Sequence, residues 1–432
     1  MSKAESFGRN RPDACPGALQ VHEAADGPLA RVRVPGGVIE AAQAQVLATS
    51  ATELGSGMIE LTSRGNVQVR GLSDPAAFAA RIAAAGLLPS VTHERVRNIV
   101  ASPFTDRALI DALDQALCAR PALAELPGRF LFSIEDIGLE ADVTYVNRRL
   151  LLAGHDAGLD VPEWMAVPLM LDAAEAFLRL RGTEWRIAEL DDGPARIAAL
   201  LGGPSTTIPP DSPNPDSPHP PGRDDSGAAR TSRPSTPSHD ERVLGRSDTP
   251  ASGSPQPLEP TEAESAGTIR PISRDREVLD GPDAARANPS SRELGVLFGG
   301  RAVQALVPLG KPTPAQLLAL ADVADEVRLT PWRTFVVRDP ADADEVERRL
   351  AAAGLVTDSD SPWAGVTACI GRPGCGKALA NVHADATAWV LGRIHAPATP
   401  VHWSGCERRC GLPRGRVLQM VATADGYDER LT

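Results

Sequence analysis

The chain has 432 residues, and its 42% hydrophobic content can fill the cores of roughly two or three domains, which excludes a wholly disordered or fibrous protein. The formal charge of -12, from 44 basic and 56 acidic residues, argues against a nucleic-acid-binding protein. No apolar run reaches the roughly 18 residues that cross a bilayer, and the start has no hydrophobic signal core. We therefore expect a cytoplasmic globular protein with no nucleic-acid or membrane partner.

Residues 1–90 predict a strand, a helix, two strands and a second helix. Apolar residues at 30, 32 and 34 alternate with Arg31 and Arg33, which is typical of a strand with one buried and one solvated face. Asp74 is the predicted N-cap of the second helix, and Gly86 is its predicted end. The expected strands are 30–34, 58–61 and 66–70, and the expected first helix is 39–54.

This pattern is repeated later in the chain. Thr62-Ser-Arg-Gly-Asn-Val-Gln-Val-Arg70 leads to Ala83-Ala-Ala-Gly-Leu87, and Thr330-Pro-Trp-Arg-Thr-Phe-Val-Val-Arg338 leads to Ala351-Ala-Ala-Gly-Leu355. In both copies an arginine follows the threonine by 8 residues and a glycine follows it by 24. The matched spacing indicates a duplication. The order of elements is that of the ferredoxin-like α+β fold, so we expect two half-domains related by a pseudo-twofold axis, with a site between them.

The region between the two copies differs in composition. Residues 204–290 hold 17 of the 39 prolines and no aromatic residue or cysteine, which predicts a disordered tether, with a proline-rich ligand for a partner domain as the alternative. An echo between Asp142-Val-Thr144 and Asp385-Ala-Thr387 suggests that the segments after the two half-domains are also related. The expected domains are half-domains at 1–90 and 291–357, a first α+β lobe at 91–203, the tether at 204–290 and a cysteine-bearing lobe at 358–432.

Four of the six cysteines lie in the last lobe. Cys369 and Cys375 have five residues between them, and Cys406 and Cys410 have three. In a cytoplasmic protein, four thiols in a glycine-rich setting indicate a metal site before a pair of disulfides. Paired ligands of structural zinc stand about two to four residues apart, so the wide first pair leaves zinc as the less favoured alternative. We expect a [4Fe-4S] cluster instead.

The residues around these thiols suit an anionic cluster. Glycines on both sides of Cys375 let backbone N–H groups approach the cluster's sulfides. A helix predicted over Lys377–Thr387 would place its positive end beside the same thiol. Cys406 and Cys410 would share one face of a helical turn.

Together these motifs resemble a known superfamily. Cys-x5-Cys with a later Cys-x3-Cys, preceded by Thr62-x-Arg64-x-x-x-Gln68 and Arg97-Asn98-Ile99, resembles the sulfite and nitrite reductases, in which a duplicated chain holds a [4Fe-4S] cluster beside sirohaem. The resemblance covers nearly everything except the tether, and it implies that both remaining lobes are of the sulfite/nitrite reductase type.

Further motifs are similar to the precorrin-3B synthase branch of that superfamily. They are Ala14-Cys-Pro-Gly17, Arg64-Gly-Asn-Val-Gln-Val-Arg-Gly71, His402-Trp-Ser-Gly-Cys-Glu-Arg-Arg-Cys-Gly411 and Asp425-Gly-Tyr427. The branch implies a monooxygenase of aerobic cobalamin biosynthesis, which oxygenates precorrin-3A at carbon 20 of the macrocycle and forms a lactone. The substrates would be precorrin-3A and dioxygen.

The resemblance also assigns roles to single residues. It implies that Cys369, Cys375, Cys406 and Cys410 bind the cluster, and that Cys410 stands where the reductases bridge the cluster to sirohaem iron. Because the two enzyme classes share this position, the thiols do not distinguish the branch from the reductases.

Arginines are the expected ligands of the substrate's carboxylates. Arg64 and Arg97 fall on positions that line the reductases' anion-binding face, so replacing either should weaken substrate binding and leave stability unchanged. Arg70 and Arg129 are further candidates, with solvated sheet-face residues as the alternative interpretation. The reductases resemble Pro-x-Lys-Phe-Lys where this chain has Pro127-Gly-Arg-Phe-Leu131, and the lost cation disfavours reduction of an inorganic anion.

The implied reaction needs electrons and a metal that activates dioxygen. The resemblance implies a mononuclear non-haem iron, for which His402 is the candidate ligand ahead of His383 and His22, while a structural hydrogen-bonding role is the alternative. Electrons would come from NADH, directly or through a separate electron-donor reductase, and sirohaem is less favoured. Two other functions stay open: a sirohaem-dependent nitrite or sulfite reductase, and a noncatalytic iron–sulfur electron-transfer or sensing protein.

Overall fold

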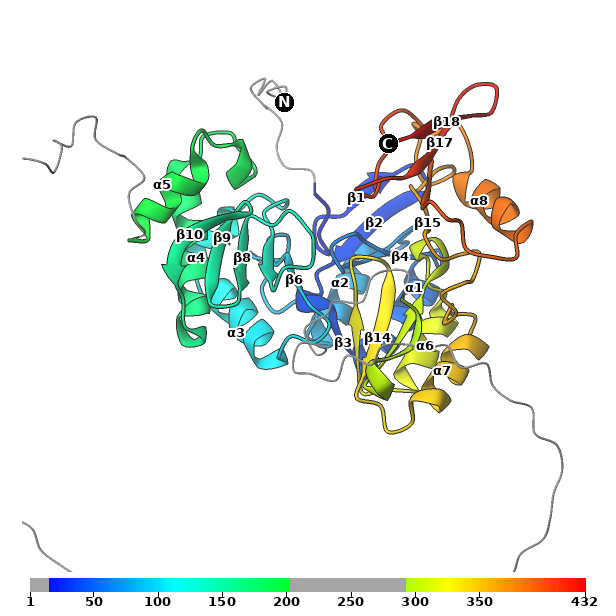
Figure 1. The fold of residues 1–432 in the computed structure, drawn as a ribbon, viewed down its shortest axis with the longest axis horizontal. Helices are drawn as coiled ribbons and strands as arrows, with labels where there is room; N and C mark the ends of the chain where they lie inside the picture. Colours follow the sequence, from blue (N-terminus) through cyan, green and yellow to red (C-terminus); the bar gives the residue numbers. More distant parts are fainter. Residues whose placement is uncertain (1–14, 203–292) are drawn as a thin grey trace, which may run out of the picture. The chain divides into compact units, whose positions relative to one another are not determined.

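The computed structural model describes residues 15–202 and 293–432, which contain four β-sheets (Figure 1). The tether predicted at 204–290 lies outside the described residues. None of the described helices combines the length and the apolar character that crossing a membrane requires. Short 3-10 helices occur at η1 (Pro35–Gly37), η2 (Pro121–Glu125), η3 (Ile187–Glu189), η5 (Phe298–Gly300) and η6 (Pro308–Gly310).

The first half-domain is an antiparallel sheet of order β1-β2-β5-β4 with two helices. The Asp74 carboxylate accepts a hydrogen bond from the Ala77 N–H at 2.9 Å, which is the predicted helix cap. The predicted start of the first helix at Ile39 is wrong, because that residue lies in strand β3. The bounds are β1 (His22–Ala24), β2 (Gly27–Val32), β3 (Val38–Glu40), β4 (Ile59–Leu61), β5 (Val67–Val69), α1 (Ala41–Leu54) and α2 (Pro75–Ala84).

The second half-domain repeats this arrangement. Its sheet has the order β11-β12-β14-β13, and β3 of the first half-domain joins its edge beside β13. Asp342 caps α7 through the Glu345 N–H at 2.9 Å, as Asp74 caps α2. The predicted ferredoxin-like duplication is therefore confirmed. The bounds are β11 (Gly295–Leu297), β12 (Ala302–Leu306), β13 (Glu326–Leu329), β14 (Thr334–Arg338), α6 (Pro314–Ala321) and α7 (Ala343–Ala352).

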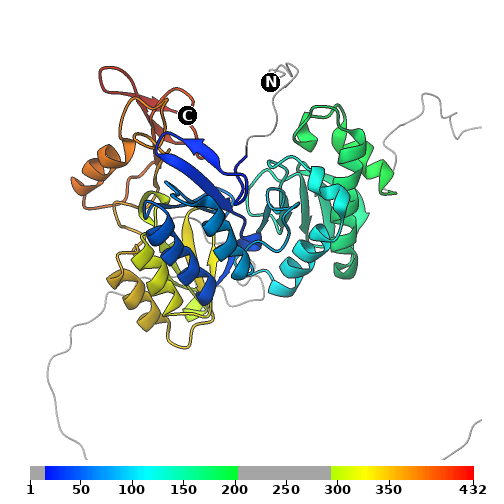
Figure 2. The same ribbon diagram turned by 180° about the vertical axis from the view of Figure 1, so that it is seen from behind.

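One hydrophobic core joins the two half-domains. Helices α1 and α6 pack against each other, with α2 and α7 outside them, and Figure 2 shows the four helices side by side on one face. On the sheet side, Gly37 has a φ of +70°, and a Cβ on it would lie 1.9 Å from the Leu329 carbonyl oxygen. Only glycine permits this close approach, so the halves meet without a gap.

The two remaining lobes share one topology. In each, three parallel strands are followed by an antiparallel one, with a helix between the first and second strands. This order supports the predicted relation between the segments. The first lobe comprises β6 (Ile99–Ala101), α3 (Arg107–Cys118), β7 (Phe132–Ile134), β8 (Val143–Val146), β9 (Arg149–Leu152), β10 (His155–Asp160), α4 (Glu163–Leu180) and α5 (Gly193–Leu200); the last comprises β15 (Val366–Ala368), α8 (Val382–Leu391), β16 (Val401–Ser404), β17 (Leu418–Ala422) and β18 (Tyr427–Leu431).

The short sequence echo that suggested this relation is itself coincidental. Asp142 and Thr144 lead into and lie within strand β8, whereas Asp385 and Thr387 lie in helix α8. The correspondence instead pairs β6 with β15, β7 with β16 and β8 with β17.

Candidate functional site

The two cysteine pairs follow neighbouring parallel strands. Cys369 comes directly after β15, and Cys406 comes two residues after β16. The carboxyl ends of parallel strands meet at one edge of a sheet, which brings the two loops together. The Gly405 N–H donates a hydrogen bond to Cys369 Sγ at 3.1 Å, and no disulfide involves any of the six cysteines.

The thiols lie within electrostatic reach of one another. Burial raises the pKa of Cys369, negative charge on Cys406 and Cys410 raises it further, and the N–H groups of Gly405 and Gly371 oppose the shift. Among the described residues, no three His, Cys, Asp or Glu side chains converge as ligands of a single ion would. A [4Fe-4S] cluster spreads four thiolates over a cube and accepts N–H bonds at its sulfurs, so the donor set fits that cluster in number and kind.

The helix predicted from Lys377 starts later than predicted, and the helical turn predicted between Cys406 and Cys410 does not form. Helix α8 begins at Val382, capped by Asn381, and does not begin beside Cys375. The chain that precedes α8 is bound to the residue after β16, because the Leu379 N–H donates to the Gly405 carbonyl at 2.7 Å. Arg409 has a φ of +47°, which breaks any helical turn between the last two cysteines. Loop N–H groups, rather than a helix end, face the thiols.

Arg70 holds the first cysteine loop in place. Its Nε and Nη2 donate to the Asp26 carboxylate at 2.8 and 2.6 Å, and its Nη1 lies 3.3 Å from Glu60 Oε2. Nη2 also donates to the Gly374 carbonyl at 2.8 Å. The guanidinium is thus occupied by two carboxylates and a carbonyl, so the structure favours a positioning role over the predicted contact with substrate.

Arg97 is likewise paired inside the protein. Its Nε and Nη2 donate to the Asp114 carboxylate at 2.7 and 2.6 Å, and its Nη1 donates to the Leu87 carbonyl at 3.2 Å. Only 4% of the side chain is exposed. These contacts favour a structural role, and the expectation that its removal leaves stability unchanged is revised below.

Arg64 and Arg33 are different, because they carry charge that no carboxylate of the described residues neutralises. The Arg64 guanidinium makes no hydrogen bond or ion pair to a described residue, and burial lowers its pKa to about 10. Arg33 donates from Nε and Nη2 to the Arg95 carbonyl, while its buried Nη1 has no partner. Burial, reinforced by Arg31, lowers the pKa of Arg33 to about 9, so the group remains charged at neutral pH.

The acids whose charge reaches these arginines have other partners: Asp142, which acts on Arg64, pairs with Arg186, and Glu94, which acts on Arg33, binds backbone N–H groups. Both oxygens of Glu94 are taken by the backbone N–H groups of Ala18 (2.7 Å), Leu19 (2.7 Å) and Gln20 (3.1 Å). Arg31 lies in β2, which ends just before Arg33, and donates to Gln68 Oε1 at 2.8 Å. The solvated strand face predicted for both arginines is wrong for Arg33, which is 2% exposed.

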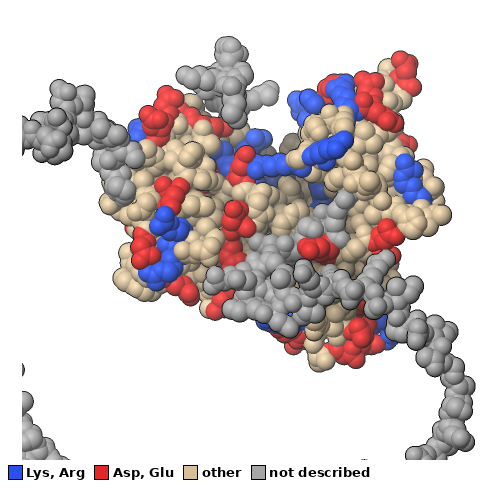
Figure 3. Space-filling view, in the orientation of Figure 1, with Lys and Arg blue, Asp and Glu red and all other residues tan. Residues whose placement is uncertain are grey.

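Two further cations act on the residues around the thiols, and neither was predicted from the sequence. Burial lowers the pKa of Lys311, whose charge interacts with Cys369, and burial also lowers the pKa of Arg333, whose charge acts on His402. Figure 3 shows Lys and Arg side chains over β1, β2 and the C-terminal segment. One signal was available: Lys311 is one of only three lysines in the chain.

His402 is fully buried, and both of its ring nitrogens are engaged. Nδ1 lies 2.9 Å from Thr367 Oγ1, and Nε2 lies 3.2 Å from the Cys410 carbonyl oxygen. Because neither nitrogen is left for a metal, the prediction that this histidine is an iron ligand is not supported. The histidine instead ties β15 to the last cysteine loop.

The segment Pro127–Leu131, which departs from the reductase pattern, ends in a buried apolar residue. Leu131 is 3% exposed and packs with Val100, Ile137 and Ala141. Arg129 is exposed, and its guanidinium carbon lies 5.1 Å from the centre of the Trp185 ring. Its predicted contact with substrate stays a prediction.

Comparison with known proteins agrees with this architecture. The family model of the nitrite/sulfite reductase ferredoxin-like half domain matches residues 22–81 and 299–353. The chain is 26% identical to a precorrin-3B synthase of a Sinorhizobium species over 437 residues, which covers 96% of this chain and 82% of that protein. It is 34% identical to the ferredoxin–nitrite reductase of Synechococcus elongatus over 124 residues, which covers 25% and 24% of the two chains.

A solved structure gives the same result for the fold. The NirA protein of Mycobacterium tuberculosis superposes with a TM-score of 0.60 at 19% identity, covering 94% of this chain and 73% of that one. The chain therefore contains two copies of the nitrite/sulfite reductase ferredoxin-like half domain and shares the fold of the NirA protein.

Proposed function

We propose that this protein is a precorrin-3B synthase, which converts precorrin-3A to precorrin-3B with dioxygen in aerobic cobalamin biosynthesis. The similarity to the Sinorhizobium protein, which spans nearly the whole chain, supports this assignment. So does the precorrin-3B synthase motif that contains Cys406 and Cys410.

The main structural support for the proposal is a pair of arginines that no carboxylate of the described residues hydrogen-bonds. Arg33 is buried and Arg64 is half-buried, and neither has a hydrogen-bonded carboxylate partner among the described residues. A precorrin is a flat macrocycle with many carboxylates, and guanidinium groups bind carboxylates through paired, charge-assisted hydrogen bonds. We therefore assign substrate binding to these two arginines and to Arg31 beside them, keep Arg129 as a further candidate, and assign positioning to Arg70 and Arg97.

The four thiols would hold a [4Fe-4S] cluster. That cluster supplies electrons one at a time, and NADH or a separate reductase is the expected source. The chain's own residues prepare its site: Gly405 directs an N–H at Cys369, and Arg70 fixes the loop of Cys375 through Gly374. The described histidines and carboxylates do not form the two-histidine, one-carboxylate set of a mononuclear iron, so we assign no ligands to such an iron.

A sirohaem-dependent nitrite reductase is the second candidate. The 34% identity to the Synechococcus enzyme favours it, although the match covers only a quarter of the chain. The buried, apolar Leu131 opposes it, because that position supplies no cation to a small anion.

One experiment separates these functions. Protein purified without oxygen would be analysed for iron, acid-labile sulfide and absorption, and then offered precorrin-3A with oxygen and electrons, or nitrite. We expect broad sulfur-to-iron absorption and turnover of the precorrin. Arg64→Gln should raise KM for the precorrin at least several-fold with unchanged melting temperature, whereas Arg81→Gln, at an exposed ion pair, should change neither. Sirohaem bands with nitrite turnover would refute the proposal, and a cluster without either activity would indicate an electron-transfer or sensing protein.

A further inference from the structure

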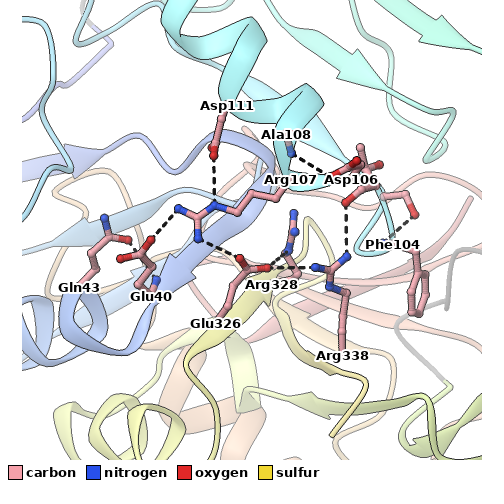
Figure 4. A network of polar contacts seen from close by, with 12 residues as sticks. Glu40, Gln43, Phe104, Asp106, Arg107, Ala108, Asp111, Glu326, Arg328 and Arg338 are labelled. Atoms are coloured by element: carbon pink, nitrogen blue, oxygen red, sulfur yellow. Dashed lines mark hydrogen bonds and ion pairs between the residues drawn. The ribbon is translucent and has the colours of Figure 1, made fainter. Parts of the chain in front are cut away.

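A serine hydroxyl beside the cysteine loops is buried and makes no hydrogen bond to a described residue. Ser404 is the last residue of β16, its exposed fraction is 0%, and its Oγ has no partner. Buried hydroxyls are ordinarily satisfied, so this one calls for a physical explanation. The unpartnered nitrogens of Arg328 have one, because that guanidinium belongs to a network of ion pairs in which three acids match three arginines (Figure 4).

The register of the sheet places Ser404 opposite the first cysteine of the candidate cluster site. The last pair of β15 and β16 is Ala368 with Trp403. The Cys369 N–H donates to the Trp403 carbonyl at 2.9 Å, which continues this pairing by one residue and sets Cys369 beside Ser404. Neighbouring strands lie about 4.7–4.9 Å apart, and paired residues project to the same face of the sheet. The hydroxyl and the thiol are therefore neighbours on one face.

The preceding pair on this face shows that side chains of the two strands meet there. Thr367 and His402 stand two residues before Cys369 and Ser404, and Thr367 Oγ1 lies 2.9 Å from His402 Nδ1. His402 Nε2 lies 3.2 Å from the Cys410 carbonyl oxygen, so the last cysteine loop lies over the same face. Because the acceptor would be a side chain already in place, a contact between Ser404 and Cys369 needs no cavity beside the hydroxyl.

We propose that the Ser404 hydroxyl donates a hydrogen bond to the Cys369 thiolate in the cluster-bound protein and thereby raises the reduction potential of the cluster. The inference rests on the cluster that the proposed function requires. The Gly405 N–H already donates to the same sulfur at 3.1 Å. Reduction adds negative charge to the cluster and its thiolates, so each donor at a sulfur favours the reduced form. Ser404 acts through Cys369 and is therefore a positioning residue.

The reduction potential is the measurement that tests this role. It would be determined by EPR-monitored redox titration of the cluster-bound wild type, Ser404→Ala and Ser50→Ala. Ser50 in α1 is the matched control, because its Oγ is equally buried and has no partner among the described residues. Ser404→Ala should disfavour reduction about tenfold, which lowers the potential of a one-electron couple by about 59 mV. Ser50→Ala should keep the wild-type potential, and equal potentials in all three proteins would overturn the proposal.

A second pair of variants separates the hydroxyl from the shape of the side chain. Ser404→Thr keeps the donor, and Ser404→Val replaces it at the same shape, so Ser404→Thr should have the higher potential by a similar shift. Equal potentials in this pair would overturn the proposal as well. EPR detects only chains that carry a reduced cluster, so partial loading of a variant leaves its potential measurable.

Iron and acid-labile sulfide distinguish a failure of this inference from a failure of the proposed function. Wild-type protein that binds neither would refute the proposed cluster, and this inference with it. A wild type that carries its cluster, with the same potential as Ser404→Ala, would refute the role of Ser404 alone.

Discussion

The arginines of this chain fall into two groups according to whether a carboxylate meets them. Arg70 and Arg97 each carry a bidentate aspartate, whereas Arg64 and Arg33 carry none among the described residues. The motifs predicted that Arg64, Arg70, Arg97 and Arg129 bind the substrate, and for Arg64 and Arg129 this stays a prediction. They could not separate the two groups, because Asp26 and Asp114 lie 44 and 17 residues away from the arginines that they bind. Such partners are set by tertiary structure, which no local spacing encodes.

The buried pair of Arg97 should be important for stability. Arg97→Gln leaves Asp114 buried without its partner, which costs about 3–5 kcal/mol of the free energy of unfolding. Arg81→Gln, which breaks an exposed pair with Glu53, should cost about 0–1 kcal/mol. Denaturant unfolding measures both, and a loss for Arg97→Gln no larger than that of the control would show that the pair is not structural.

The ion pair of Asp26 and Arg70 predicts that the free energy of unfolding decreases at acid pH. The hydrogen bond from Arg70 holds the pKa of Asp26 below its usual 3.8 in the folded protein. Its stabilisation is therefore fully present above pH 3.8 and is lost as the pH falls below 3.8 through the lower folded value. The free energy of unfolding of Asp26→Asn should fall less steeply over this range. Parallel curves for the two proteins would contradict the assigned shift.

At the scale of elements, the cysteine loops depend on where strands end. The four thiols and their glycines were predicted from spacing, and both pairs do follow the carboxyl edge of one sheet. The helix predicted at Lys377–Thr387 begins only at Val382, since the Leu379 N–H binds the end of β16 instead of joining the helix. A bond between distant segments overrides the local propensity there.

The close packing around Gly374 allows a direct test of whether Arg70 anchors the loop of Cys375. A Cβ on Gly374 would lie 2.8 Å from Arg70 Nη2 and 3.1 Å from Asp26 Oδ2, so Gly374→Ala should displace the loop of Cys375 and lower iron and labile sulfide per chain by more than half. At Gly376 the nearest atom would be 3.8 Å away, which makes Gly376→Ala the matched control. Equal iron content in both variants would show that the loop does not need this anchor.

For the whole molecule, the duplication was readable because both copies keep the same spacing from a threonine to a helix-ending glycine. Gly86 and Gly354 have φ values of +76° and +81° and end α2 and α7 alike. The pairing of β3 with the sheet of the second half-domain was not predictable, because a strand of three residues beside a helix does not indicate which sheet it joins. The relation of the two outer lobes likewise lies in strand order and not in shared residues.

The proposed function is that of an oxygenase for a precorrin. It is tested most directly by turnover of precorrin-3A under oxygen-18, with protein purified without oxygen and supplied with electrons, followed by mass spectrometry of the product. We expect a lactone product that contains one atom of the heavy isotope, and loss of turnover when Cys375 is replaced by serine. Recovery of unchanged precorrin-3A, from protein that carries its full cluster and reduces nitrite or sulfite, would contradict it.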